Sequence, residues 1–175
     1  FTNEGVSCDG PTESFTITVN PTAQVDIPVD QVICNAEATT VLFTTDNTVG
    51  VTAYAWTSDI EIGAGLTGAG DMSFTAANEG TDPLVATIIV TPTFTNEGVS
   101  CDGPTESFTI TVNPTAQVDI AVDQVVCNAE AISVLFTTEN TVGVTAYTWT
   151  SDIEIGAGLT GAGDMSFTAA NEGTD

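Results

Sequence analysis

The sequence contains no lysine, arginine or histidine, although it carries 24 aspartate and glutamate residues and a net charge of −24. Side-chain ion pairs cannot form within such a chain. Each carboxylate must therefore be hydrated, hydrogen-bonded to backbone or hydroxyl groups, or bound to a cation. Nucleic acid and anionic membranes bind proteins through lysine and arginine, so we expect neither as a partner. The excess of like charge favours solubility and opposes lateral self-association.

The same absences remove most catalytic chemistry. A serine or cysteine nucleophile has no histidine to activate it, and no lysine is present to form a Schiff base. We therefore expect that the chain is not an enzyme. Runs of 18 or more apolar residues are also absent, so we predict no membrane insertion in this segment.

What the chain does contain is a repeat of 93 residues. Residues 1–26 return unchanged at 94–119. Alignment of 1–82 with 94–175 leaves six differences, which are Pro28/Ala121, Ile33/Val126, Thr39/Ile132, Thr40/Ser133, Asp46/Glu139 and Ala55/Thr148. Near-identical copies are typical of stalks, fibres and multivalent adhesins, and enzymes rarely need them. Because the chain lacks an initial methionine and stops within a repeat, we expect it to belong to a longer tandem array.

Each repeat is built from runs in which apolar and polar residues alternate. In residues 107–112, for example, Phe108, Ile110 and Val112 share one face and threonines occupy the other, which is the pattern of a β-strand. The glycine-rich run 62–71 is one of several turn-forming segments between the runs. The predicted strands of one repeat are Ala23–Val29, Thr39–Thr45, Thr52–Ser58, Ile60–Ile62, Asp71–Ala76, Leu84–Phe94 and Ser107–Asn113.

Seven short antiparallel strands in roughly 90 residues are typical of an immunoglobulin-like sandwich. We therefore predict an all-β fold of tandem immunoglobulin-like, antiparallel β-sandwich modules with a 93-residue period. Trp56 lies in the third predicted strand, where alternation favours a place in the core. If Trp56 and Tyr54 were exposed instead, they could stack on sugars.

The sequence Asn-Pro-Thr at 20–22 and again at 113–115 marks the predicted module boundary, because proline ends a strand and stiffens a short linker. On this phasing, residues 1–20 are the C-terminal strands of a preceding module and 21–113 are one complete module. Residues 114–175 are the N-terminal part of a following module that lacks its last strands and leaves a bare strand edge. Either the polypeptide continues as further modules, which we favour, or a neighbouring copy supplies a strand by donor-strand addition.

Four segments carry a resemblance to a known family. They are Ile33-Cys34-Asn35, Tyr54-Ala55-Trp56-Thr57, Ser73-Phe74-Thr75-Ala76 and Phe108-Thr109-Ile110-Thr111-Val112-Asn113-Pro114. In this order the chain resembles, over essentially its whole length, the PKD-like, immunoglobulin-like tandem repeats of large bacterial cell-surface adhesins of the Bacteroidota type. The resemblance implies export, an extracellular or cell-surface location, and a spacer or adhesive role without catalysis.

We therefore predict a structural or adhesive repeat array that forms an extracellular filament or a surface adhesin stalk. The alternative is a calcium- or carbohydrate-binding module that is presented in many copies, whose repetition raises avidity. The predicted partners are further copies of the chain itself along a filament. Divalent cations are a second candidate partner, because no basic side chain neutralises the carboxylates.

Four cysteines, Cys8, Cys34, Cys101 and Cys127, occupy two positions of the repeat. They form no CxxC pair and have no histidine beside them, so a disulfide in an oxidising compartment is the better interpretation than a metal site. The resemblance implies one bond in each module, from Cys34 to Cys101, with the partners of Cys8 and Cys127 outside this segment. The alternative is a bond between Cys34 and the corresponding cysteine of a neighbouring module, which would staple the fibre along its length.

Carboxylates gather at several places where calcium, which takes six to eight oxygen ligands, could bind. These places are Asp26/Asp30, Asp59/Glu61, Glu79/Asp82 and Glu97/Asp102, with Asp119 and Asp123 at a module junction. None has the spacing of an EF-hand or of a calcium-binding nonapeptide repeat. A hydrated acidic surface is therefore the competing interpretation, and calcium remains a candidate cofactor without identified ligands.

Overall fold

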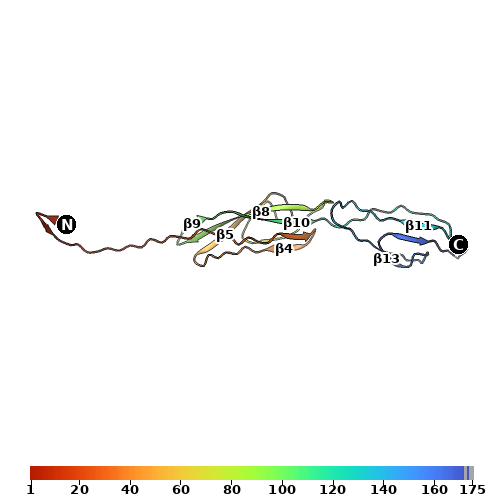
Figure 1. Ribbon diagram of the computed structural model, residues 1–175, viewed down its shortest axis with the longest axis horizontal. Helices are drawn as coiled ribbons and strands as arrows, with labels where there is room; N and C mark the ends of the chain where they lie inside the picture. The colour runs from red at the N-terminus through yellow and green to blue at the C-terminus, as the bar shows by residue number, and fades with distance from the viewer. Residues whose placement is uncertain (172, 174–175) are drawn as a thin grey trace.

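The computed structural model describes residues 1–171 and 173, which form β-strands and connecting segments without any helix. The all-β fold class predicted from the sequence is therefore confirmed. The chain is drawn out along one axis (Figure 1), with an extended N-terminal segment, a central unit and a C-terminal unit following one another. The last positions of the predicted third module, 172, 174 and 175, lie outside the described residues.

One sheet of the central unit holds most of its strands. β8 (Leu84–Asn96) is its long central strand, and β9 (Val99–Asp102) folds back on the end of β8 as a hairpin. Every pair in this sheet is antiparallel except β3 with β10, which run parallel. Across the sheet the order is β3 (Gln31–Cys34), β10 (Glu106–Asn113), β8, β5 (Val51–Ser58) and β6 (Thr67–Ala69).

The opposite layer is a smaller sheet made of β4 (Ala38–Val41) and β7 (Met72–Thr75), which pair antiparallel. A single bridge between Asp26 and Thr44 continues this layer toward the start of the unit. Side chains from both layers meet in one cluster of buried residues. The central unit is thus a β-sandwich.

Alternation along β10 decides which side chains enter the core. Phe108, Ile110 and Val112 are buried, while the threonines between them face outward, as the period-2 pattern predicts. Apolar residues of β8 and of the opposite layer complete the cluster. Its buried members are Val25, Ile33, Val41, Phe43, Trp56, Ile62, Met72, Ala76, Ala86, Ile88, Val90, Phe108, Ile110 and Val112.

The core position predicted for Trp56 is confirmed, because its side chain is buried in this cluster. Trp56 pairs with Gly68 of β6, and the indole ring lies over the space that a Cβ at Gly68 would need. The glycine-rich run predicted as a tight turn also packs closely. At Gly63, where φ is +98°, a Cβ would overlap the carbonyl oxygen of Thr75.

The predicted strands at Thr52–Ser58, Leu84–Phe94 and Ser107–Asn113 correspond to β5, β8 and β10. The predicted strand Thr39–Thr45 overlaps β4, and Asp71–Ala76 contains β7. Two strand predictions are wrong. Residues 23–29 form only the bridge at Asp26, and 60–62 form no strand. Their alternation reflects burial alone, since Ala23, Val25 and Ile62 reach the core without joining a ladder. β3, β6 and β9 were not predicted from the sequence.

The C-terminal unit repeats part of this arrangement. β11 (Ala131–Val134) pairs with β14 (Met165–Thr168) in the register of β4 with β7. β12 (Thr148–Thr150) pairs with β13 (Thr160–Ala162) in the register of β5 with β6. Within the described residues, no strand stands where β8 and β10 stand in the central unit. The two small sheets therefore leave uncovered the side of the unit that β8 and β10 cover in the central unit.

In the part of the chain that the structure describes, the N-terminal segment lacks a sheet to pack against, whereas the C-terminal unit lacks strands to cover its sheets. Its only pairing is a short hairpin between β1 (Thr2–Asn3) and β2 (Val6–Ser7), and residues 8–20 run extended without ladder partners. In Figure 1 this segment leads away from the central unit as a single thread. Its apolar side chains, Phe15, Ile17 and Val19, are exposed.

Candidate functional site

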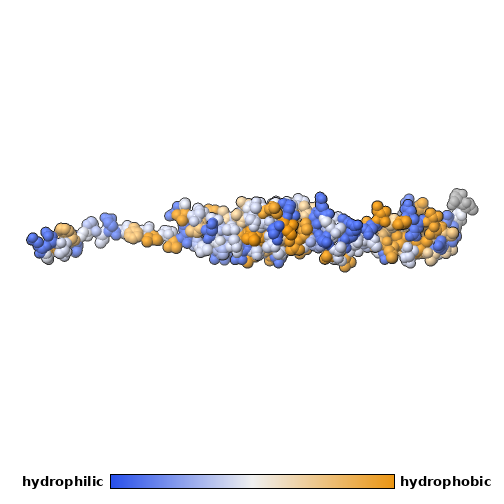
Figure 2. All heavy atoms as spheres, turned by 90° about the horizontal axis from the view of Figure 1, so that it is seen from above, coloured by the Kyte–Doolittle hydropathy of each residue, from blue (hydrophilic) through white to orange (hydrophobic). Residues whose placement is uncertain are grey.

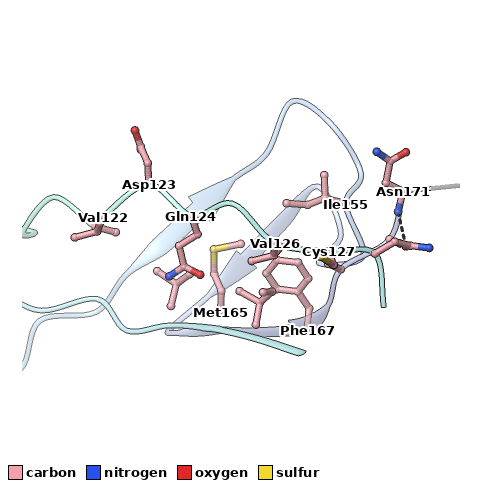
Figure 3. Close-up of a pocket in the computed structure, with 15 residues that line it drawn as sticks. Val122, Asp123, Gln124, Val126, Cys127, Ile155, Met165, Phe167 and Asn171 are labelled. Atoms are coloured by element: carbon pink, nitrogen blue, oxygen red, sulfur yellow. Dashed lines mark hydrogen bonds between the residues drawn. The ribbon is translucent and has the colours of Figure 1, made fainter. Parts of the chain in front are cut away.

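The C-terminal unit carries an open groove of about 380 Å³. Its floor is apolar, with Met165 and Phe167 of β14 and Ile132 of β11 lying below residues 121–128 (Figure 3). Ile155 and Val126 close its sides, while Asp123 and Asn171 stand at its rim. An apolar floor with a polar rim is the composition of a binding groove.

The same residues of the central unit explain the origin of the groove. Ile33, Ile62 and Met72 are the counterparts of Val126, Ile155 and Met165, and in the central unit they are buried under β8 and β10. In the C-terminal unit, Val126 is 40% exposed and Ile155 is 41% exposed. The groove is thus the half of a sandwich core that two strands cover in the complete unit.

Three polar groups in the central unit hold the covering strand β10 in place. The Asp30 carboxylate accepts a hydrogen bond from the Thr109 N–H at 2.7 Å. The Asn78 side-chain amide donates to the Val112 carbonyl at 2.7 Å, and the Asn35 N–H donates to the Asn113 carbonyl at 2.9 Å. Asn78 is itself buried, so its bond to the Val112 carbonyl forms away from water.

The counterparts of these groups surround the groove of the C-terminal unit. They are Asp123, Asn171 and Asn128, and the Asn171 N–H donates a hydrogen bond to the Asn128 side-chain oxygen at 2.9 Å. The equivalent bond in the central unit runs from the Asn78 N–H to Asn35 at 2.8 Å. The polar frame of the strand site is therefore assembled in both units. The sequence analysis did not identify these residues, which resemble ordinary turn residues when viewed without their distant partners.

The cysteines are free thiols in the structure, with Cys8, Cys34 and Cys127 exposed and Cys101 half-buried. Cys34 ends β3 beside Asn113, next to the level at which Val112 pairs with Leu84. Cys101 pairs with Phe94, near the other end of β8. The strand from Leu84 to Phe94 spans about 33 Å.

A disulfide requires Cα atoms about 4.4–6.8 Å apart, so the register does not bring Cys34 and Cys101 together within one module. Because they stand at opposite ends, Cys34 instead faces the junction with the next unit. Cys101 faces the junction with the preceding one. This placement agrees with the alternative considered from the sequence, in which the bonds run between modules.

Several of the carboxylates predicted as calcium ligands accept hydrogen bonds from the backbone and from hydroxyl groups. Asp59 accepts from the Thr87 N–H at 2.7 Å, and Glu61 accepts from the N–H groups of Gly63 and Gly65 at 2.7 and 2.9 Å. Asp26 accepts from the Thr44 hydroxyl and Asp102 from the Thr93 hydroxyl, at 2.6 and 2.8 Å. Among the described residues, no three carboxylate, cysteine or histidine side chains converge as a metal site.

The aromatic pair Tyr54 and Trp56 does not form a sugar-binding platform. Trp56 is buried, and the Tyr54 ring packs against Phe43 with a centroid separation of 5.6 Å. Partial burial raises the pKa of Tyr54, and the nearby negative charges of Asp26 and Asp71 raise it further. Tyr54 therefore packs within the sandwich, close to the carboxylates of Asp26 and Asp71.

In the described part of the chain, no helix has the length and apolar character needed to cross a membrane. The site that stands out is the groove, together with the extended segment whose sequence matches the strand that fills it elsewhere. Comparison with protein-family models, with curated proteins and with solved structures found no match for this chain.

Proposed function

We propose that the chain is a structural or adhesive repeat array of PKD-like, immunoglobulin-like modules, which forms an extracellular filament or the stalk of a surface adhesin. The observation that carries this proposal is the in-line joining of successive units through ordered contacts. Figure 1 shows the N-terminal segment, the central unit and the C-terminal unit in succession along one axis. Such an arrangement adds length with each repeat, as a stalk or fibre requires.

The junction between the central and C-terminal units is held by polar contacts. The Asn140 side-chain amide donates to the carbonyls of Thr81 and Thr115, each at 3.3 Å. The Asn35 amide donates to the Thr115 hydroxyl at 2.9 Å, and the Thr141 hydroxyl donates to Asp82. Pro114 fixes the backbone beside these contacts. Because hydrogen bonds link residues of both units across the junction, the two units are expected to form a semi-rigid spacer and not a flexible tether.

The preceding junction is built in a related way. The Asn96 amide donates to the Asn20 side-chain oxygen at 3.0 Å, and the Asn47 amide donates to the Thr22 carbonyl at 3.3 Å. Asn47 is the counterpart of Asn140, so the same residue locks the same linker in both repeats. Repetition of this linker contact supports a regular filament over a string of independent domains.

The charge also suits an extracellular fibre that stays single. Every carboxylate adds to a net charge of −24 that no basic side chain offsets, so neighbouring fibres repel unless cations screen them. Divalent cations are accordingly proposed as partners that control bundling, alongside further copies of the chain. This role requires no dedicated coordination site.

The test is low-dose imaging of the native assembly. The expected result is a thin filament whose axial repeat equals one module or two, and β8 alone, with 13 residues, spans roughly 43 Å of a module. Addition and removal of magnesium or calcium should change lateral bundling without changing the axial repeat. A compact particle without an axial repeat would contradict the proposal.

A further inference from the structure

We propose that the groove of the C-terminal unit binds residues Glu13–Asn20 of a second copy of this chain, as a strand parallel to residues 124–127. The inference rests on the proposed filament and specifies how its subunits connect. Each copy of residues 1–175 then carries both a donor segment, 13–20, and an acceptor groove in its C-terminal unit. Such a head-to-tail contact does not close on itself, so it propagates into a fibre.

The donor segment matches the strand that fills this site in the complete unit. Glu13–Asn20 has the same sequence as β10, Glu106–Asn113. Within β10 the apolar face is buried, whereas Phe15 is 84% exposed and Val19 is 85% exposed. Figure 2 shows hydrophobic surface along the part of the N-terminal segment that leads to the central unit, and again over the C-terminal unit. A row of exposed apolar side chains on an extended segment is ready for strand addition.

The register of the docked strand follows from the central unit. There Ile110, Thr111, Val112 and Asn113 pair with Gln31, Val32, Ile33 and Cys34 in turn. Transferred by the repeat, Ile17 pairs with Gln124, Val19 with Val126 and Asn20 with Cys127. A one-residue slip would turn the apolar face of the donor outward, so the groove selects this register.

The rim of the groove supplies the polar contacts for the same register. The Asp123 carboxylate accepts the hydrogen bond of the Thr16 N–H, as Asp30 does with Thr109. The Asn171 amide donates to the Val19 carbonyl, as Asn78 does to Val112. The Asn128 N–H donates to the Asn20 carbonyl, as Asn35 does to Asn113. The apolar floor and the polar rim of the groove thus both fit residues Glu13–Asn20 in the same register.

Electrostatics sets the conditions for docking. Glu13 is the only charged residue of the donor segment, so the contact itself brings few charges together. Each of the two copies nevertheless carries a net charge of −24, so the copies repel each other within about a Debye length. Assembly should therefore strengthen as salt is added, in contrast to contacts made by opposite charges.

Residues 1–20 cover only part of the groove. Phe1–Asn3 correspond to the end of β8, 94–96, while the stretch equivalent to 83–93 has no counterpart in them. A peptide with the sequence of residues 83–93 fits between the docked donor and the edge of β12. Its addition should stabilise assemblies of the chain by completing the larger sheet.

The experiment is sedimentation velocity on the 175-residue chain over a range of concentrations at moderate salt. Wild-type chain is expected to form a ladder of head-to-tail oligomers that the 83–93 peptide extends. Ile17→Glu places a charge on the buried face of the donor and should leave monomers. Thr18→Glu, on the opposite face of the same segment, is the matched control and should assemble as wild type does.

Mixing gives a directional test of the contact. Ile17→Glu keeps a working groove, and Met165→Glu keeps a working donor segment. Each variant alone should be monomeric, and the equimolar mixture should stop at dimers, because only one complementary contact can form. Unchanged assembly of Ile17→Glu would overturn the proposal, and so would a wild-type chain that stays monomeric throughout the range.

A second measurement separates this proposal from the proposed filament. A fluorescent peptide with the sequence of residues 83–113 contains both strands that cover the core of the central unit. If wild-type chain is monomeric but binds this peptide, the groove accepts the continuation of a polypeptide. The contact between copies is then overturned while the modular array stands. If monomeric chain does not bind the peptide, both proposals fail, because the C-terminal unit does not complete itself as a module.

Discussion

Ile17 and Ile110 occupy the same position of the repeated sequence, yet Ile17 is 77% exposed and Ile110 is completely buried. Ile110 faces the core between the apolar residues of β8 and those of the opposite layer. Ile17 has the same neighbours along the chain and lacks that partner surface. The difference between them lies in the tertiary surroundings alone, so the two residues form a natural matched pair for measuring what strand insertion contributes.

Truncation of this pair should therefore have unequal effects on folding. Ile110→Ala removes buried methyl and methylene groups and leaves a cavity, which typically lowers the free energy of unfolding by about 2–5 kcal/mol. Ile17→Ala, on an exposed side chain, should change it by less than about 0.5 kcal/mol. Denaturant unfolding of dilute monomeric chain, followed by tryptophan fluorescence, measures both values. Equal losses would show that residues 13–20 are already packed in the monomer.

Gly68 offers a test of the close contact with Trp56. A Cβ at Gly68 would overlap the indole ring, and the φ angle there is not in the left-handed region, so sterics alone oppose a side chain. Gly68→Ala should cost about 1–3 kcal/mol through overpacking and should shift tryptophan emission. Gly10→Ala, where no atom lies within 4 Å of the added Cβ, is the control and should be neutral. Unperturbed emission from Gly68→Ala would contradict the packing.

Asn78 is predicted to hold β10 against the loop that precedes β8. Its side-chain amide donates to the carbonyls of Asp82 and Val112, and its oxygen accepts from the Gly80 N–H. Asn78→Ala leaves these buried groups unpaired, which should cost about 1–3 kcal/mol. Asn171→Ala, at the equivalent exposed position, should leave the stability of the monomer unchanged and weaken assembly at the groove. Chemical denaturation and sedimentation velocity measure the two effects separately.

The part of the fold that local patterning determines could be predicted from the sequence. β5, β8 and β10 alternate strictly or are apolar on both faces, and their pattern survives because each lies inside a wide sheet. The burial of Trp56 followed from the same periodicity. The uncovered side of the C-terminal unit also follows from the phase of the repeat, because 114–171 contain no sequence equivalent to β8 or β10.

Features that depend on distant partners could not be predicted in this way. β3 is short, follows Pro28, and becomes a strand only by pairing in parallel with β10, far along the chain. Asp30, Asn35 and Asn78 look like turn residues until β10 is placed beside them. The placement of Cys34 and Cys101 could not be predicted for the same reason, because only the strand register shows that the two residues stand at opposite ends of a module.

The raised pKa of Tyr54 predicts a specific alkaline sensitivity. Its cause is burial first and the charges of Asp26 and Asp71 second, so the folded chain keeps the phenol proton to higher pH than the unfolded chain does. The contribution of Tyr54 to stability is complete below the unfolded pKa, about 10, and is lost as pH rises through the folded pKa. Ultraviolet titration of Tyr147→Phe, which leaves Tyr54 as the only tyrosine, measures the shift.

Tyr54→Phe supplies the control for this titration. It removes the ionisable group while keeping the ring that packs on Phe43. The stability of Tyr54→Phe should fall less steeply above pH 10 than that of wild-type chain. A tyrosine in Tyr147→Phe that titrates as a free phenol does would contradict the prediction.

The cysteine positions predict which thiols meet in an assembled fibre. A docked donor segment carries Cys8 to the start of its partner's C-terminal unit, beside the junction where Cys34 of the central unit lies. Cys127 of that C-terminal unit likewise comes to the junction that Cys101 of the donor copy faces. Oxidised glutathione should therefore join Cys8 to Cys34 and Cys127 to Cys101 between copies, each disulfide releasing two molecules of reduced glutathione.

Peptide mapping under non-reducing conditions checks these pairs. Trypsin cannot be used because the chain has no lysine or arginine, so a glutamate-specific protease is required. Cys8→Ser and Cys34→Ser should each abolish the first pair and spare the second. Ile17→Glu, which prevents docking, should abolish both. Recovery of a Cys34–Cys101 peptide from monomeric chain would contradict the strand register, since about 33 Å of β8 separates these levels.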